Sequence, residues 1–113
     1  MEKFLRNKSF QVDFILQYKD RATAINLDLL DEIDVVVYNS LTKAVLLNRK
    51  LSLSEVNKTN ASLGMCSIYI NPSETVSAPV GAYEYIITIE FSDENYTSGI
   101  ATPAGEGECF ILK

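Results

Sequence analysis

The stretch YEYIITIEF, residues 83–91, decides the fold class of this chain. Its odd-numbered residues are all aromatic or aliphatic, and most of its even-numbered residues are Glu or Thr. Because successive side chains of a strand point to opposite faces, this period of two predicts a β-strand that buries one face in a core. The abundance of β-branched and aromatic residues, which strands favour, supports the same interpretation.

The same period of two recurs along the chain. Residues 9–18 alternate between an apolar set, which includes Phe10, Val12, Phe14 and Leu16, and a mostly polar set. This pattern predicts a second long strand near the start of the chain. Shorter strands are predicted at residues 25–29, 33–38, 44–47, 65–70 and 108–112.

Turn and loop signals separate the predicted strands. In the irregular segment 51–63, Ser52 and Glu55 have the spacing of a helical capping box, which indicates a single turn of helix. Residues 57–60 (NKTN) then favour a loop. The remaining predictions are a break between strands at residues 31–32, a short helical turn at 73–76, a turn at 92–95, a loop ending at 102–105 and a flexible turn at 105–107.

About seven short strands without a long helical period predict an all-β protein, an antiparallel β-sandwich. A parallel α/β arrangement would need crossover helices of about a dozen residues, which no segment supplies. The chain has 113 residues, a length typical of one compact domain. Residues 1–113 are therefore expected to form a single sandwich.

Composition argues against several classes of function. The formal net charge is −5, whereas binding to nucleic acid needs clustered Lys and Arg, so nucleic acid is not an expected partner. No apolar run approaches the roughly 20 residues of a membrane span, so no membrane contact is expected. The chain has no histidine, which removes imidazole catalysis and the commonest zinc sites. Without a signal-peptide pattern, we expect a reducing cytoplasm and free thiols at Cys66 and Cys109 rather than a disulfide.

Two groups of neighbouring carboxylates are candidates for chemistry. They are Asp31, Glu32 and Asp34, and the pair Asp93 and Glu94. Paired carboxylates perform acid–base catalysis when their surroundings separate their pKa values, and clustered oxygens bind calcium. Adjacent carboxylates on turns are more often simply solvated, and no calcium-loop sequence is present. We therefore expect no enzymatic activity, no metal and no cofactor.

The tyrosines are candidates for contacts with ligands. Tyr83 and Tyr85 could stack on sugars or bases, but their phase on a long strand favours the core. Tyr83 follows Gly81 closely and could form a tyrosine corner, in which the hydroxyl fixes the backbone of a loop. Weaker candidates for surface contacts lie near predicted strand ends: Tyr38, Tyr69 and Tyr96.

Three apolar side chains fall on the outward phase of predicted strands: Ile15, Val36 and Ile86. A solitary monomer would usually place Thr, Lys or Glu at such positions. Single exposed apolar residues are normal, but three of them on three strands could merge into a patch of the kind that marks a protein interface. We predict that Ile15, Val36 and Ile86 take part in such an interface.

Five segments carry a resemblance to a known family. They are FQVDFILQY at residues 10–18, AINL at 24–27, IDVVVY at 33–38, GAYEYII at 81–87 and GECFIL at 107–112. In their order and character the chain resembles the small immunoglobulin-like domains of tailed-phage virion proteins, especially the N-terminal domains of upper baseplate proteins. The resemblance spans nearly the whole chain, and it implies an immunoglobulin-like sandwich.

The resemblance also implies a function. It points to a non-enzymatic structural part of a virion, either a tail or baseplate adaptor or a capsid decoration. The expected partners are other virion structural proteins, with a homo-oligomer as a further possibility, and the expected location is the virion after synthesis in the bacterial host cytoplasm. A small carbohydrate-binding module that uses tyrosines on its loops is the alternative. Such a module would show a concave polar groove with an exposed aromatic side chain.

Overall fold

The alternating stretch at residues 83–91 forms the middle of β7 (Gly81–Phe91), as predicted. In this computed structural model, which describes residues 2–17, 23–91 and 100–113, β7 pairs antiparallel with β3 (Leu30–Asn39) and with β8 (Ile100–Leu112). Its side chains at Tyr83, Ile87 and Ile89 are buried. β7 is therefore a central strand of the molecule.

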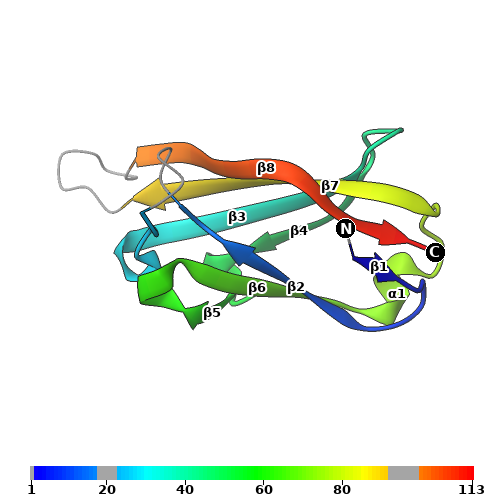
Figure 1. The fold of residues 1–113 in the computed structure, drawn as a ribbon, viewed down its shortest axis with the longest axis horizontal. Coiled ribbons are helices and arrows are strands. Elements are labelled where there is room, and N and C mark those ends of the chain that lie inside the picture. The colour runs from blue at the N-terminus through cyan, green and yellow to red at the C-terminus, as the bar shows by residue number, and fades with distance from the viewer. Residues whose placement is uncertain (1, 18–22, 92–99) are drawn as a thin grey trace.

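Two sheets make up the described part of the chain (Figure 1). The larger sheet has the strand order β1-β8-β7-β3-β4, where β1 is Lys3–Phe4 and β4 is Val45–Lys50. The smaller sheet has the order β2-β6-β5, with bounds Phe10–Ile15, Met65–Ile70 and Asn57–Asn60. The prediction of a mainly β, two-sheet protein is confirmed.

The prediction of purely antiparallel pairing is wrong at one edge. β1, which the sequence did not predict, runs parallel to β8 and places Lys3 beside Ile111. The amide of Ile111 donates to the carbonyl of Glu2 at 2.9 Å, and the amide of Lys113 donates to the carbonyl of Phe4 at 2.9 Å. The free edge of β8 thus holds the short N-terminal segment. Because this pairing depends on a strand far away in the chain, no local sequence pattern predicts it.

Apolar side chains of both sheets fill the space between them. β2 buries Phe10, Val12 and Phe14 and exposes the residues between them, as its alternation predicts. At the end of the sandwich that holds both termini, four rings pack together: Phe4, Phe10, Tyr83 and Phe110. Phe10 belongs to the smaller sheet and the other three to the larger one, so this cluster joins the two sheets.

The strand predicted at residues 25–29 is not formed. Leu27–Leu29 is a 3-10 helix instead, in which Leu27 is buried and Leu29 is exposed. The side-chain oxygen of Asn26 accepts a hydrogen bond from the amide of Asp28 at 3.1 Å. This local bond folds the backbone into a turn, which outweighs the apolar alternation.

The segment 51–63 departs from prediction in two ways. The capping box expected between Ser52 and Glu55 is absent, because Ser52 binds Glu32 while Glu55 accepts from the amide of Lys50 at 3.1 Å. Residues 57–60, expected as a loop, form β5 by pairing with β6 although all four are exposed. The single turns found here are 3-10 helices at Leu51–Leu53 and Ala61–Leu63.

The loop and flexible turn predicted at residues 102–107 are also wrong, since this segment belongs to β8. Pro103 lies opposite Thr88, next to a register shift that follows the pair Gly105 and Ile87. Such irregularities accommodate a proline within a sheet. The expected break at residues 31–32 is likewise absent, because both residues lie in β3. The predicted turn at residues 92–95 lies outside the described residues.

The short helix predicted at residues 73–76 is confirmed as α1 (Pro72–Thr75). Its capping box is formed by Asn71 and Glu74, and the amide of Asn71 donates to Glu74 at 2.9 Å. Pro72 occupies the first helical turn, where its missing amide hydrogen costs nothing. α1 and the residues after it lead directly into β7.

The predicted tyrosine corner is present at the start of β7. The buried hydroxyl of Tyr83 donates to the carbonyl of Pro79 at 2.8 Å. We expect Tyr83→Phe to lower the free energy of unfolding by about 1–2 kcal/mol, because the carbonyl loses its partner while the ring stays packed. Urea denaturation would measure this loss, and an unchanged stability would show that water replaces the hydroxyl.

Candidate functional site

The structure brings together two of the three residues predicted for an interface. Val36 on β3 lies directly opposite Ile86 on β7, so their side chains are neighbours on the outer face of the larger sheet. Ile15 lies at the end of β2 in the smaller sheet and is 61% exposed. The idea that all three merge into one patch is therefore wrong, because the outer faces of the two sheets point in opposite directions. Their role as contact residues stays a prediction.

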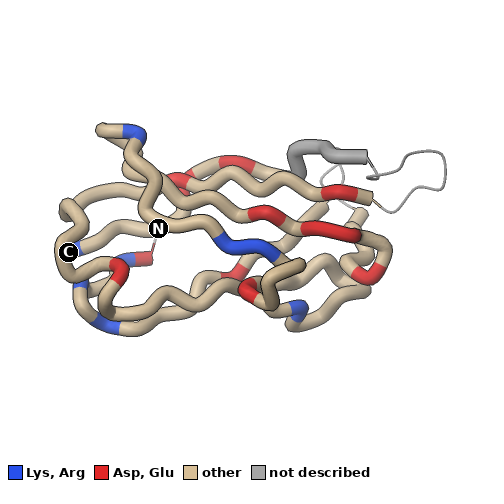
Figure 2. Tube along the Cα trace, turned by 180° about the vertical axis from the view of Figure 1, so that it is seen from behind, with Lys and Arg blue, Asp and Glu red and all other residues tan. Residues whose placement is uncertain are grey.

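Carboxylates surround the Val36–Ile86 pair. We define the acidic face as the outward-facing residues Asp34, Glu84, Glu90, Glu106 and Glu108 with this apolar pair at its centre. Glu106 lies opposite Ile86 on β8, and Asp34 precedes Val36 by two residues on β3. Figure 2, the view from behind, shows acidic residues spread along the strands of the larger sheet. On the β4 side, Asn48 lies opposite Val36 and Lys50 lies opposite Asp34. The face therefore combines an apolar centre with a rim in which carboxylates outnumber lysines.

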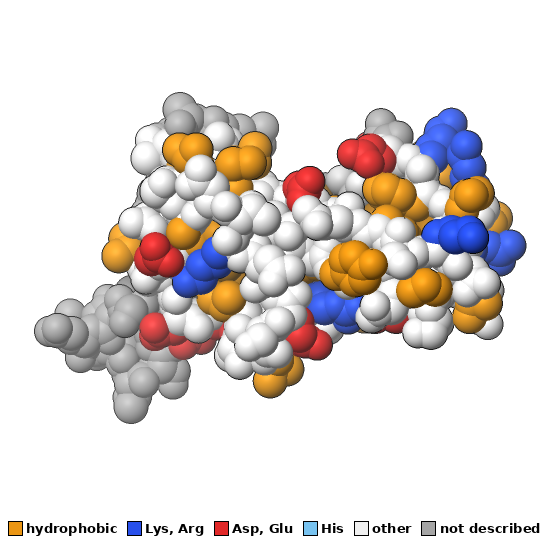
Figure 3. Space-filling model, turned by 90° about the horizontal axis from the view of Figure 1, so that it is seen from below, with side chains coloured by type: hydrophobic (Ala, Val, Ile, Leu, Met, Phe, Trp, Pro, Cys, Tyr) orange, Lys and Arg blue, Asp and Glu red, His pale blue; other side chains and the backbone are white. Residues whose placement is uncertain are grey.

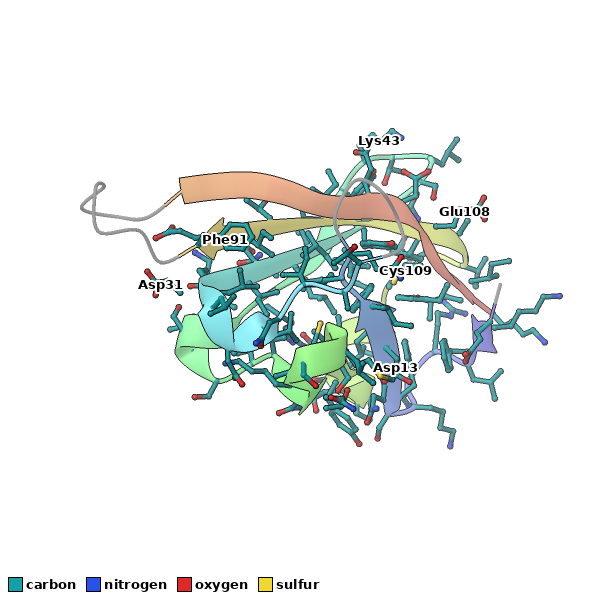
Figure 4. All side chains as sticks on the ribbon, turned by 60° about the vertical axis from the view of Figure 1, so that its left-hand side comes forward. Asp13, Asp31, Lys43, Phe91, Glu108 and Cys109 are labelled. Carbon is teal, nitrogen blue, oxygen red and sulfur yellow. The ribbon has the colours of Figure 1, made fainter. Side chains whose placement is uncertain are left out.

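Next to the apolar pair, Tyr38 lies opposite Glu84. The hydrogen bond with Glu84, a small loss of hydration and the charges of Glu84 and Glu106 raise the pKa of the Tyr38 hydroxyl above its ordinary value. Lys43 reaches over this pair: its Nζ is 3.8 Å from Glu84 and 5.6 Å from the centre of the Tyr38 ring. Figure 4 shows Lys43 and Glu108 on the same side of the molecule and Asp13 of β2 on the other.

Like charges oppose each other on this face. Glu84 lies directly opposite Glu108, and Glu32 lies opposite Glu90. Carboxylates in directly opposite positions on neighbouring strands destabilise a sheet. Within the molecule, Lys43 offsets part of this cost at Glu84, and hydrogen bonds from Ser52 and Ile33 offset part of it at Glu32.

Of the carboxylates of this face, Asp34 was singled out from the sequence, whereas Glu84, Glu90, Glu106 and Glu108 were missed as candidates. Residues 105–107 were expected to form a turn, and yet they continue β8. Glu106 and Glu108 point outward while Phe110 and Leu112 are buried, although an unbroken period of two would place all four on one face. A register shift between the pairs Tyr83–Phe110 and Glu84–Glu108 changes the phase of β8, and with the glycines at 105 and 107 it hides this strand from a reading of alternation.

In the first group of predicted carboxylates, neighbouring donors bind Glu32 and Asp34 separately. Glu32 accepts hydrogen bonds from Ser52 and from the amide of Ile33, and Asp34 accepts one from Asn48. Slight burial raises the pKa of Glu32, but these bonds outweigh it, and the pKa lies below its ordinary value. The other pair, Asp93 and Glu94, lies outside the described residues. Within the part of the chain that the structure describes, no three His, Cys, Asp or Glu residues group together as a metal site would require.

The two cysteines are free thiols, as predicted. Burial raises the pKa of Cys66 to about 11, with the charge of Asp13 adding to this effect, and raises the pKa of Cys109 to about 12. Both thiols are therefore protonated near neutral pH. Because the thiolate is the reactive form, neither side chain is prepared to act as a nucleophile.

A groove of about 280 Å³ lies between the β3–β4 turn and the segment that joins α1 to β7. Its lining includes Thr42, Glu74 and Ser77, and Tyr83 is the aromatic residue among those that line it. The Tyr83 ring is buried and its hydroxyl is bonded to Pro79, so the groove offers no aromatic platform for a sugar. Of the other tyrosines, Tyr85 is partly buried, Tyr69 is exposed on β6, and Tyr96 is outside the described residues.

An ion pair fixes one wall of this groove. Arg49 of β4 binds the carboxylate of Glu74 in α1 and also donates to the carbonyl of Tyr69 at 3.2 Å. Both side chains are largely buried. Burial raises the pKa of Glu74, but the bonds from Arg49 and Asn71 outweigh it, so that the pKa lies below its ordinary value.

This lowered pKa predicts a change in acid stability. The ionised form of Glu74 is favoured in the folded state, so its contribution is present above pH 4.5 and is lost as the pH falls through the lower pKa of the folded state. We expect Glu74→Gln to lower the stability at neutral pH by about 1–2 kcal/mol and to lose less stability than the wild type below pH 4.5. Urea denaturation over this pH range would test it, with Glu2→Gln as an exposed control. If the free energy of unfolding falls with pH in the same way for the wild type and Glu74→Gln, the prediction is wrong.

Comparison with known proteins gives no relative: no family model, no curated protein and no solved structure matches this chain. Among the described residues, no helix has the length and apolar character needed to cross a membrane.

Proposed function

We propose that this chain is a non-enzymatic structural domain that acts through protein–protein contacts on the outer face of its larger sheet. The observation that carries the proposal is the Val36–Ile86 pair within its rim of carboxylates. Apolar centres with polar rims are characteristic of protein interfaces. The protonated thiols and the solvated or hydrogen-bonded carboxylates support a role in contact rather than in catalysis.

We further propose that the fold is immunoglobulin-like. The order β8-β7-β3-β4 corresponds to strands G, F, C and C′ of a variable-type domain, and β2-β6-β5 corresponds to B, E and D. Tyr83 forms its corner at the start of the strand that corresponds to F. Two residues later, Tyr85 contacts Phe14 of β2 with ring centroids 4.9 Å apart, at the place where antibody domains link strands B and F by a disulfide.

The proposed setting is a tailed-phage virion, where the domain would serve as a tail or baseplate adaptor or as a capsid decoration. This setting rests on the sequence resemblance described above. Its partners would be other virion structural proteins, and the chain would reach the virion after synthesis in the bacterial cytoplasm. A passive contact domain suits such a part, because a rigid core can present one prepared face to its neighbours.

Quantitative mass spectrometry of particles from the phage or prophage that encodes the chain tests this proposal. The chain should be present in purified particles in a fixed ratio to the other structural proteins. Ile86→Glu should reduce its incorporation strongly, because a charge is placed in the apolar centre of the interface. Ile15→Glu is the matched control, since it makes the same change on the other sheet and should leave incorporation intact. Absence of the chain from purified particles would refute the virion role.

A further inference from the structure

Positive charge gathers at the end of the sandwich that holds the termini. We define the basic end as Lys3, Arg6, Lys8 and Lys113, all of which are exposed, with Glu2 as an exposed carboxylate among them. Lys3 lies beside Ile111 on the outer face of the larger sheet, so the basic end adjoins the acidic face at the β1 edge. The amide of Lys113 donates to the carbonyl of Phe4, so the two terminal segments lie side by side. Figure 3 shows Lys and Arg side chains gathered at this end, with hydrophobic side chains among them.

The basic end also has an apolar centre. Leu5, Val76 and Val80 are each more than half exposed there. The segment around Leu5 is held beside the α1–β7 connection, because Arg6 donates to the carbonyl of Ala78 at 3.3 Å and the amide of Asn7 donates to Thr75 at 3.0 Å. The basic end is thus the reverse in charge of the acidic face, and both surround apolar side chains.

We propose that the acidic face of one copy of this chain binds the basic end of a second copy, head to tail. The inference rests on the proposed function and deepens it by naming the partner. Opposite charges would meet at the rim of such a contact, and Val36 and Ile86 would pack against apolar side chains of the basic end. The second copy's lysines would also relieve the repulsion between Glu84 and Glu108.

Charge favours this arrangement over a symmetric dimer. Two acidic faces would bring like charges together, and so would two basic ends. A head-to-tail contact is heterologous, so each copy keeps one free acidic face and one free basic end. Repetition of the contact then builds a ring if it closes and a filament if it does not.

The test uses two charge-reversed variants of the full chain. The acidic-face variant carries Glu106→Lys and Glu108→Lys, and the basic-end variant carries Lys3→Glu and Lys8→Glu. The control variant carries Asp13→Lys and Asp28→Lys, which change the net charge as the acidic-face variant does but lie outside both surfaces. Circular dichroism would establish that each variant is folded, and sedimentation velocity would measure its mass over a wide range of concentrations.

The wild type and the control variant should associate with rising concentration. The association should weaken at about 1 M NaCl, where charges are screened beyond about 3 Å. Each of the other two variants alone should associate at least about tenfold more weakly than the wild type, because both sides of its contact then carry the same charge. An equimolar mixture of these two should associate again, since the intact basic end of one meets the intact acidic face of the other.

A wild type that stays monomeric at all concentrations would overturn the inference, and so would an association that survives in each variant alone or a mixture that stays monomeric. These results leave the proposed function standing if the chain is found in purified particles. Absence from particles combined with self-association would have the opposite meaning: the head-to-tail contact would hold and the virion role would fail.

Discussion

A Gly64→Ala variant is expected to lose on the order of 3 kcal/mol of unfolding free energy or more. Gly64 is buried and has φ +70°, a left-handed conformation that costs an L-residue about 1 kcal/mol or more. A Cβ atom there would lie 2.3 Å from the carbonyl oxygen of Leu16. That carbonyl already accepts from the amide of Ile25 at 2.9 Å, and the carbonyl of Gly64 accepts from the amide of Leu16 at 2.8 Å. The backbone can relieve the clash only by breaking this network.

Gly105→Ala is the matched control for that experiment. Gly105 lies in β8, and its added Cβ would make an ordinary 3.7 Å contact with the ring of Tyr85. Its stability should change by less than about 1 kcal/mol, because alanine loses less conformational freedom in a strand than glycine does. Urea denaturation of both variants measures the difference. Equal stabilities would show that the segment around Gly64 yields without cost and that the close approach to Leu16 has no role.

Phe110→Ala is expected to lower the free energy of unfolding by about 3–5 kcal/mol, the range for removal of a large buried ring. Phe110 is fully buried and contacts three aromatic rings, with centroid distances of 5.9 Å to Phe4, 5.1 Å to Phe10 and 5.3 Å to Tyr83. Its removal would leave a cavity at the point where both sheets and β1 meet. Because this cluster supports the segment that carries the basic end, we also expect increased hydrogen exchange in β1.

Ile111→Ala is the control for this second variant. Ile111 is the next residue of β8, and its side chain is only partly buried on the other face of the strand. The Ile111→Ala substitution should lower the free energy of unfolding by about 1 kcal/mol, because the side chain that it removes buries less apolar area than Phe110 does. A loss at Phe110 no larger than that at Ile111 would mean that the neighbouring rings collapse into the space and that the cluster does not join the sheets.

The sequence alone predicts the strands whose alternation is strong. β2, β3, β4, β6 and β7 lie where the sequence predicted strands, and the buried faces of β2 and β7 are as predicted, but β2 ends at Ile15 although the prediction extended it to residue 18. The corner at Tyr83 was also predictable, since its partner is four residues away at Pro79. In each of these cases a short stretch of chain contains the information, because alternation and turns are local properties.

Other elements depend on a partner strand. β1 and β5 are short and lack a clear apolar phase, and they form because β8 and β6 present free edges to them. Leu27–Leu29 differs from these strands, because it depends on a local contact. There the side chain of Asn26 accepts a hydrogen bond from the amide of Asp28, and this bond outweighs an alternating pattern that favours a strand. In β8, a register shift allows Pro103 to lie within a strand.

The candidate site shows the same division. The sequence by itself determined that Ile15, Val36 and Ile86 are apolar residues on outward faces of strands. Only the tertiary structure decided that Val36 and Ile86 are neighbours, that Ile15 lies on the other sheet, and that glutamates of β8 complete the acidic face. The physical reason is that alternation reports which side of its own strand a residue occupies, whereas the surface it joins depends on pairing between strands far apart in the chain.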